Sequence, residues 1–198
     1  MHDVAQEAAP ILRIVGVGGT TEPASSTELV LETAMGHLER HTVDATILRG
    51  ADLDLPLYRA GAVDRSAKAR RLVDAVGAAD GIIVASPGYH GTVSGMVKNA
   101  LDYLEELRGG RRGYLEGRAV GCIALAADSE SAVSTLHTLR VVVHALRGWP
   151  TPLGVALCEE DVEFGSPEGP AAMQVRVLAD QVHRFAQLRA GSAQPVYP

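Results

Sequence analysis

The first segment whose residue types could bind a ligand is residues 16 to 27. It reads Gly-Val-Gly-Gly-Thr-Thr-Glu-Pro-Ala-Ser-Ser-Thr and lies between an apolar run and a helical pattern. A helix N-terminus presents unpaired N–H groups and a partial positive charge, and nearby hydroxyls add donors, so this segment suits a phosphate. The candidate ligands are Gly19, Thr20, Thr21, Ser25, Ser26 and Thr27. A structural interpretation is equally open, in which Ser25 or Ser26 caps the helix and Gly18-Gly19 forms a tight turn.

The spacing of these glycines disfavours two common nucleotide motifs. After Gly16 and Gly18, the third position of a dinucleotide fingerprint is Thr21, which hinders close contact with a pyrophosphate. No Gly-Lys-Ser/Thr follows, so the loop of nucleoside triphosphate enzymes does not fit either. The pattern therefore favours a single terminal phosphate.

The histidines and cysteines give no pattern for metal binding or covalent catalysis. His37 and His41 share a predicted helix face at i, i+4 spacing, but no third ligand lies nearby in sequence, so solvated side chains are the simpler interpretation. Cys122 and Cys158 lie in apolar segments without Cys-x-x-Cys spacing, and we expect both to be buried small hydrophobic residues. No Gly-x-Ser-x-Gly elbow supports serine hydrolase chemistry.

Residues 84 to 104 form the second informative segment, reading Val-Ala-Ser-Pro-Gly-Tyr-His-Gly-Thr-Val-Ser-Gly-Met-Val-Lys-Asn-Ala-Leu-Asp-Tyr-Leu. This segment resembles the NADPH-dependent FMN reductase family of flavodoxin-like proteins, whose loop typically reads Ser-Pro-x-Tyr-Asn-Gly-x-x-x-Gly before a helix containing Lys-Asn-Ala-Leu-Asp. The matching residues are Ser86, Pro87, Tyr89, Gly91, Gly95, Lys98, Asn99, Ala100, Leu101 and Asp102. The resemblance extends to residues 19 to 25, similar to Gly-Ser-x-Arg-x-x-Ser, and to residues 53 to 58, similar to Asp-Leu-Pro-Leu-Tyr.

The resemblance implies FMN as cofactor, NADPH or NADH as hydride donor, and no catalytic side chain, because the flavin carries the chemistry. It places the phosphate among the hydroxyl groups of the first loop and the isoalloxazine ring along the second. The implied ring-side residues are Pro87, Gly88, Tyr89, His90 and Gly91, joined by Asp128 and Ser129 from a third loop. Alternatively, Tyr89 is a surface aromatic residue and His90 a plain loop residue in place of the family's asparagine. Lys98 and Asn99 fit helix packing as well as catalysis.

The sequence departs from the family pattern at acidic positions. Glu22 replaces the arginine of the family's phosphate loop, which puts a negative charge where a charge-assisted donor is expected. Residues 126 to 132 read Ala-Ala-Asp-Ser-Glu-Ser-Ala, so Asp128 and Glu130 add two further charges where the family is rich in glycine. Carboxylates are also favoured at helix N-termini, and a capping role is the simpler interpretation for at least one of them.

Alternating apolar runs and amphipathic stretches predict the elements that position these loops. The strand-like runs are 11–17, 45–48, 81–85, 119–126 and 153–158. Helical spacing occurs within 29–38, 72–76, 96–104, 136–146 and 175–185. Near-continuous apolar strands indicate burial on both faces of a parallel sheet. We therefore predict a flavodoxin-like three-layer α/β sandwich, with a five-stranded parallel sheet in the order 2-1-3-4-5 and helices on both faces. Its ligand loops lie at the carboxyl ends of the strands.

Length and composition favour one domain over residues 1–198, with 1–10 and 190–198 as loose ends. The chain has 46% hydrophobic residues, a formal charge of −6 and no basic run, so nucleic acid is not an expected partner. Its apolar runs are too short to span a bilayer and its first residues lack a signal pattern, so we expect a cytoplasmic protein without membrane contact.

The leading functional expectation is an FMN-dependent NAD(P)H oxidoreductase that passes electrons to free flavin, a quinone or another small acceptor. The family resemblance also implies a homodimer or homotetramer. Two alternatives stay open. One is a dedicated biosynthetic flavoenzyme for a quinone-like substrate, suggested by His90 and the altered third loop. The other is a flavodoxin-fold binding protein that has lost FMN, suggested by Glu22, Asp128 and Glu130.

Overall fold

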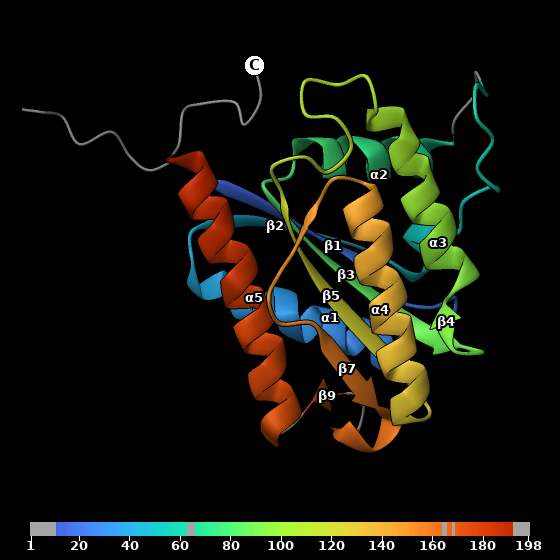
Figure 1. The fold of residues 1–198 in the computed structure, drawn as a ribbon, viewed down its shortest axis with the longest axis vertical. Helices are drawn as coiled ribbons and strands as arrows, with labels where there is room; N and C mark the ends of the chain where they lie inside the picture. Colours follow the sequence, from blue (N-terminus) through green and yellow to red (C-terminus); the bar gives the residue numbers. More distant parts are fainter. Residues whose placement is uncertain (1–10, 63–65, 164–165, 168, 192–198) are drawn as a thin grey trace, which may run out of the picture.

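The computed structural model describes residues 11–62, 66–163, 166–167 and 169–191. A parallel sheet runs through the molecule between two layers of helices (Figure 1). Its long strands follow the order β2 (Val43–Arg49), β1 (Leu12–Gly18), β3 (Gly81–Tyr89) and β5 (Ala119–Ala126). Two shorter strands, β6 (Trp149–Pro150) and β7 (Val155–Cys158), both pair with β5 at the far edge. The predicted parallel α/β sandwich is confirmed.

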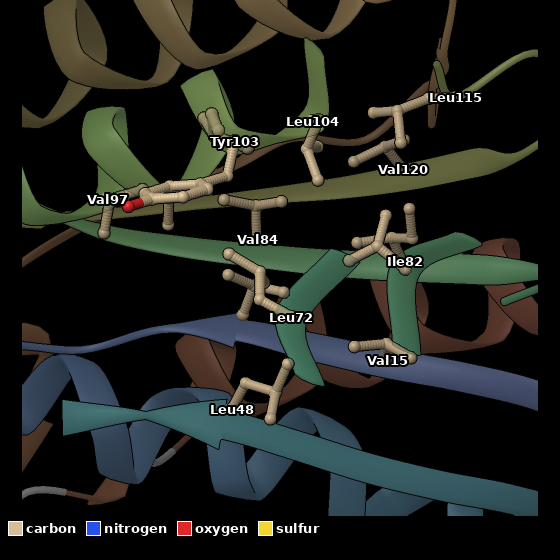
Figure 2. Close-up of a cluster of buried hydrophobic side chains, with 14 of the residues drawn as sticks. Val15, Leu48, Leu72, Ile82, Val84, Val97, Tyr103, Leu104, Leu115 and Val120 are labelled. Atoms are coloured by element: carbon tan, nitrogen blue, oxygen red, sulfur yellow. The ribbon is translucent and has the colours of Figure 1, made fainter. Parts of the chain in front are cut away.

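Both faces of the sheet are buried because apolar side chains occupy both registers of its strands. Ile14 and Ile83 point into one core, which is covered by α1 (Ser26–His37) and α5 (Gly169–Ala190). Val15 and Ile82, one position along each strand, point into the other core. Helices α2 (Ala67–Ala78), α3 (Gly95–Asp102) and α4 (Ser129–Ala145) cover that second face, which Figure 2 shows in close-up.

Local sequence sets where the helices begin. Ser25, Ser66, Ser94 and Asp128 are the N-caps of α1, α2, α3 and α4, and each side chain accepts the N–H of the residue three positions later. Short 3₁₀ helices extend or link the main elements: η1 (Leu38–Arg40), η2 (Gly50–Leu53), η3 (Tyr103–Leu107) and η4 (Glu159–Asp161). The capping interpretation of Ser25 and of Asp128 is thus confirmed.

The fifth predicted strand, 153–158, is wrong in its extent. The edge strand starts earlier and is broken: β6 pairs with the beginning of β5, and β7 pairs with its end. Pro150 and Pro152 have no N–H to donate to the sheet, which accounts for the interruption. Short antiparallel pairs were also not predicted: β4 (Thr92–Val93) pairs with the end of β3, and β8 (Val162–Glu163) with β9 (Ser166–Pro167).

The expectations for the two cysteines and for the ends of the chain are only partly met. Cys122 is fully buried, and burial raises the pKa of its thiol to about 12, whereas Cys158 is partly exposed at the end of β7. The loose C-terminal end was expected from residue 190, but α5 continues to Ala190. Residues 1–10 and 192–198 lie outside the described part of the chain. Among the described helices, none has the length and apolar content needed to cross a membrane.

Candidate functional site

The three loops singled out by the sequence follow β1, β3 and β5, at one edge of the sheet. Strand register aligns Gly18 with Ala85, and Pro87 with Leu125, so the carboxyl ends of these strands lie side by side. Gly18 has to be glycine, because a Cβ atom there would lie 2.2 Å from the carbonyl oxygen of Ala85. The sheet therefore gathers the loops as predicted, in the position where open α/β sheets bind ligands.

The loop after β1 is held largely by its own polar groups. The Thr20 hydroxyl accepts the N–H of Glu22 at 3.1 Å and donates to the carbonyl of Glu22 at 3.2 Å. Ser25 Oγ accepts the N–H of Glu28 at 3.4 Å as the N-cap of α1. Ala24 has a left-handed φ of 55°, and its N–H donates to Glu28 Oε2 at 3.1 Å. Two of the predicted phosphate ligands, Thr20 and Ser25, thus already use their hydroxyls to shape the loop.

The remaining donors of this loop lie at the start of α1. Ser26 and Thr27 are its first two residues, whose N–H groups have no acceptor within the helix. The Thr21 side chain is exposed, and that of Thr27 is buried. Gly19 adopts a φ of 103° and donates a long 3.4 Å hydrogen bond to Ala85 O. The donors left in this loop are therefore mainly backbone N–H groups, with the side chains of Thr21 and Ser26 beside them.

Acidic side chains dominate the electrostatics around this cradle. Glu28 is buried, and its carboxylate lies behind the loop, where a Cβ on Gly19 or Gly50 would collide with it. Glu22 is exposed on the loop itself. A cavity of about 400 Å³ joins the loop to η2, and Arg49 in its wall is ion-paired with Glu32. The sequence singled out Glu22, whereas Glu28 was interpreted only as part of a helix cap, because it lies three residues after Ser25.

The loop after β3 is a tight hairpin. Gly88 and Tyr89 pair with Val93 and Thr92 of β4, and His90 and Gly91 form the two-residue turn with φ values of 53° and 76°. Left-handed backbone at both turn positions is typical of such hairpins. Tyr89 is 53% exposed and His90 is exposed as well. The structure thus leaves an aromatic ring and an imidazole free at the sheet edge.

Helix α4 braces this hairpin from outside. Ser134 Oγ donates to the carbonyl of Gly91 at 2.7 Å. A Cβ on Gly88 would lie 2.7 Å from Thr135 Oγ1 and 2.8 Å from the Cβ of Ala126. The glycine at 88 is therefore required by packing against α4 and β5. Thr135 is fully buried, and its hydroxyl has no hydrogen-bond partner among the described residues. No sequence motif marks Ser134 or Thr135.

Two serines fix the path from β3 to α3. Ser86 Oγ accepts the N–H of Ser94 at 3.0 Å and donates to the carbonyl of Pro87 at 2.9 Å. Ser94 caps α3 by accepting the N–H of Val97 at 3.2 Å. Ser86 is fully buried, so these bonds satisfy a hydroxyl that would otherwise be costly to bury. The matching Ser-Pro pair thus has a structural role beneath the hairpin.

The loop after β5 ends in a strong helix cap. Asp128 Oδ1 accepts the N–H of Ser131 and Oδ2 accepts its hydroxyl, both at 2.8 Å. These hydrogen bonds lower the pKa of Asp128. Asp128, Ser129 and Glu130 are all exposed. Asp128 also helps to raise the pKa of the Cys158 thiol, after burial and the charges of Asp161 and Glu160. The loops after β5 and β7 therefore carry a group of negative charges.

Asn99 and Lys98 have structural partners. Asn99 Oδ1 accepts the N–H of Tyr58 at 2.8 Å, and its Nδ2 donates to the carbonyl of Pro56 at 3.1 Å. Tyr103 also donates to Pro56, at 2.8 Å. Lys98 pairs with Asp102 on the same helix at 2.6 Å. The Lys-Asn-Ala-Leu-Asp motif therefore anchors the loop at residues 55–58.

The residues present fit FMN at the level of donor groups and exposure. The start of α1 offers unpaired N–H groups for a phosphate, and the hairpin offers backbone and an exposed aromatic side chain for a planar ring. The charges fit less well, because the loop after β1 carries the exposed Glu22 and α1 begins with the buried Glu28 close behind it. Among residues 11–62, 66–163, 166–167 and 169–191, no group of three or more His, Cys, Asp or Glu is arranged to hold a metal ion.

Comparison with known proteins gives consistent matches along most of the chain. The family model described as NADPH-dependent FMN reductase matches residues 12–162. An FMN-dependent NADPH-azoreductase of Staphylococcus aureus is 28% identical over 178 residues, covering 84% of this chain and 91% of that protein. An apo structure of an NADH:FMN oxidoreductase aligns with a TM-score of 0.69 and 25% identity, covering 93% of this chain and 92% of that chain. The fold is also similar to FerB, an NAD(P)H:(acceptor) oxidoreductase of Paracoccus denitrificans, with a TM-score of 0.70, 17% identity and coverage of 88% and 99%.

Proposed function

The chain belongs to the NADPH-dependent FMN reductase family, and from that membership we propose that it oxidises NADPH or NADH through FMN held by the three loops. The chemistry that bound FMN supplies is hydride acceptance from a nicotinamide and delivery of two electrons to an acceptor. The acceptor we propose is a small molecule: free flavin, a quinone or an azo compound like that named for the S. aureus relative. The observation that carries this proposal is the convergence of the family's loops on one sheet edge.

Each loop has a separate task in this proposal. The N–H groups of Ser26 and Thr27 and the hydroxyl of Thr21 bind the phosphate, because these donors have no partner inside α1. The hairpin from Pro87 to Gly91 orients the isoalloxazine ring. Asp128 and Ser129 border the ring's polar edge, with Asp128 chiefly keeping α4 in place. No side chain of the loops has to transfer a proton in the hydride step.

Flavin binding and NADPH oxidation test this function directly. Titration of the flavin-free protein with FMN, followed by flavin fluorescence, should give one site per chain. NADPH oxidation should then depend on added FMN and on a quinone, an azo dye or excess flavin as acceptor. Binding without turnover for any acceptor would contradict the reductase function, and absence of flavin binding would contradict the site as well.

A binding protein that has lost FMN is the second candidate, and the acidic loops favour it. Glu22 and Glu28 belong to the loop proposed for the phosphate and the start of α1, and Asp128 lies on the third of the loops proposed to hold FMN. Like charges near a dianion weaken its binding, although backbone donors at a helix N-terminus oppose that effect. Protein purified with a flavin absorbance band close to one flavin per chain would exclude this candidate.

The assembly and cellular setting are part of the same proposal. We propose a cytoplasmic homodimer or homotetramer. Exposed apolar residues on the outer surface of α4 support self-association, with Val133 59% and Val141 56% exposed. Light scattering coupled to size-exclusion chromatography tests it, since a monomer across micromolar concentrations would contradict the oligomer.

A further inference from the structure

A second cavity lies at the amino ends of the strands, whereas the proposed flavin site lies at their carboxyl ends. It has a volume of about 510 Å³ and lies where the last turns of α5 pass the start of β1 (Figure 1). The described residues that line it are Leu12, His41, Thr42, His183, Gln187, Ala190 and Gly191. Leu12 is the first residue of β1, whereas the loops assigned to FMN follow the last residues of the strands. The cavity is therefore separate from those loops.

His183 is the unusual residue of this cavity. It is only 7% exposed, and its imidazole makes no hydrogen bond to any residue within the described ranges. Its ring stacks on that of His41, with centroids 4.0 Å apart and planes 18° apart. His183 lines the cavity, and its ring nitrogens are not among the fully buried polar atoms that lack a partner, so they are open to the cavity. A polar ligand in the cavity can therefore form a hydrogen bond with this imidazole.

The neighbouring charges define which ligand would fit. Arg40 Nε donates to His41 Nε2 at 3.2 Å, and since a guanidinium is always protonated, a neutral His41 carries its proton on Nδ1. Asp180 is already shared by Arg40 at 2.6 Å and His37 at 3.1 Å, with His41 at 3.7 Å. Burial and then the charge of His41 lower the pKa of His183.

The lining offers donors but no carboxylate. Thr42 and Gln187 add a hydroxyl and an amide to the two imidazoles, and the described lining residues include no Asp or Glu. Leu12 and Ala190 supply an aliphatic wall. A metal ion is not favoured, because no group of three or more suitable ligands occurs in the described part of the chain. A ligand with both an anionic acceptor group and an apolar body suits this mixture.

We propose that this cavity binds a small organic carboxylate, and that binding is coupled to protonation of His183, which stacks on His41. The carboxylate would accept hydrogen bonds from the imidazoles and stabilise the protonated form of His183. The charged groups facing the pair are Arg40 and Asp180, and His37 contacts the same oxygen of Asp180. Because the bound complex takes up a proton, affinity should rise as pH falls through the ordinary histidine range near ~6.5.

Benzoate is a suitable probe, since it combines a carboxylate with an apolar ring. Histidine ring resonances of the full chain would be followed by NMR during benzoate titration at pH 6 and pH 8. We expect saturable shifts of the His183 and His41 signals, with affinity about tenfold tighter or more at pH 6. Signals of His137 and His144, both exposed on α4, should not move.

Variants of the lining residues distinguish binding at this cavity from a general effect of anions on the protein. His183→Gln keeps hydrogen-bonding capacity but cannot take up the proton, so it should remove the pH dependence of benzoate affinity. Thr42→Val keeps both imidazoles and should weaken binding at both pH values, which guards against a His183 variant that fails to fold. His137→Gln should change nothing.

Three results would overturn the proposal. These are the absence of a saturable shift, equal shifts at His137 and His144, or unchanged pH dependence in His183→Gln. Saturation by inorganic phosphate but not by benzoate would mean an adventitious ion only. FMN affinity, measured in parallel, should not respond to benzoate, so failure of this inference leaves the proposed flavin function untouched.

Discussion

The two loops proposed to hold opposite ends of the flavin are stabilised in different ways. The loop after β1 is held from within, by the Thr20 hydroxyl on Glu22 and by the Glu28 carboxylate on Ala24. The hairpin after β3 is held from outside, by Ser134 on Gly91 and by close packing of Gly88 against α4. The difference implies that substitutions act locally in the first loop and through α4 in the second.

Gly88→Val should have the largest effect, because it breaks the contact between the hairpin and α4. A β-branched side chain would collide with Thr135 Oγ1 and the Cβ of Ala126, both within 2.8 Å of the added carbon. Overpacking of this kind costs about 1–3 kcal/mol. We expect a lower free energy of unfolding in urea and loss of binding for both FMN and riboflavin.

Gly95→Ala is the matched control for that experiment. Gly95 belongs to the same loop region, yet a Cβ there has no neighbour within 4 Å. It should keep parental stability and flavin affinity. Unchanged urea stability in Gly88→Val would mean that α4 does not brace the hairpin and that the comparison of the two loops is mistaken.

Glu22→Arg should have the next largest effect, and it should act on the phosphate alone. Removal of one negative charge and addition of a positive one beside a dianion should tighten FMN by about 1 kcal/mol, roughly fivefold in Kd. Riboflavin lacks the phosphate, so its Kd should not change. The gain should shrink with added salt, because Glu22 is exposed.

Glu39→Arg is the control for net charge, since Glu39 is exposed on η1, outside the loops assigned to FMN. If FMN tightens equally in both variants, the effect is one of overall charge. If Glu22→Arg binds FMN within about twofold of the parent, the side chain points away from the phosphate, as the extended preference of a residue before Pro23 would allow.

The sequence predicted most of what local rules control. Apolar runs located β1, β3 and β5, and the Ser25 and Asp128 caps followed from ordinary helix chemistry. The short strand at Trp149–Pro150 was missed, because it lies before the apolar run at 153–158 and no apolar run of its own marks it.

Sequence patterns could not predict which distant segments come into contact. Ser134 meets Gly91 across 43 positions, and Thr135 faces Gly88 only because α4 packs on the end of β3. The same holds at the amino ends of the strands, where His41, the residue after η1, stacks on His183 of α5. The prediction that His37 and His41 are solvated side chains on one helix face is wrong: α1 ends at His37, His41 follows η1, and both contact Asp180 of α5.

Asp128→Asn should have a smaller effect that depends on pH. The hydrogen bonds from Ser131 lower the pKa of Asp128 in the folded protein below its ordinary value of 3.8. The carboxylate therefore stabilises the fold above that ordinary value, and the contribution is lost as pH falls through the lowered one. Urea unfolding should show the variant less stable than the parent at pH 7, with the gap closing in acid. A gap that persists unchanged in acid would contradict a charged cap.

Ser134→Ala should have the smallest effect, and it tests the bracing of the hairpin most narrowly. The lost hydrogen bond to Gly91 is 2.7 Å long but solvent-exposed, so its net contribution is about 0.5 kcal/mol. If the hairpin orients the flavin ring, riboflavin and FMN should weaken together by about twofold. Thr138→Ala removes a hydroxyl on the same helix that bonds only to the carbonyl of Ser134, so it should leave flavin affinity unchanged. Equal weakening in the two variants would trace the effect to α4 itself, and weakening of FMN alone would assign the hairpin to the phosphate.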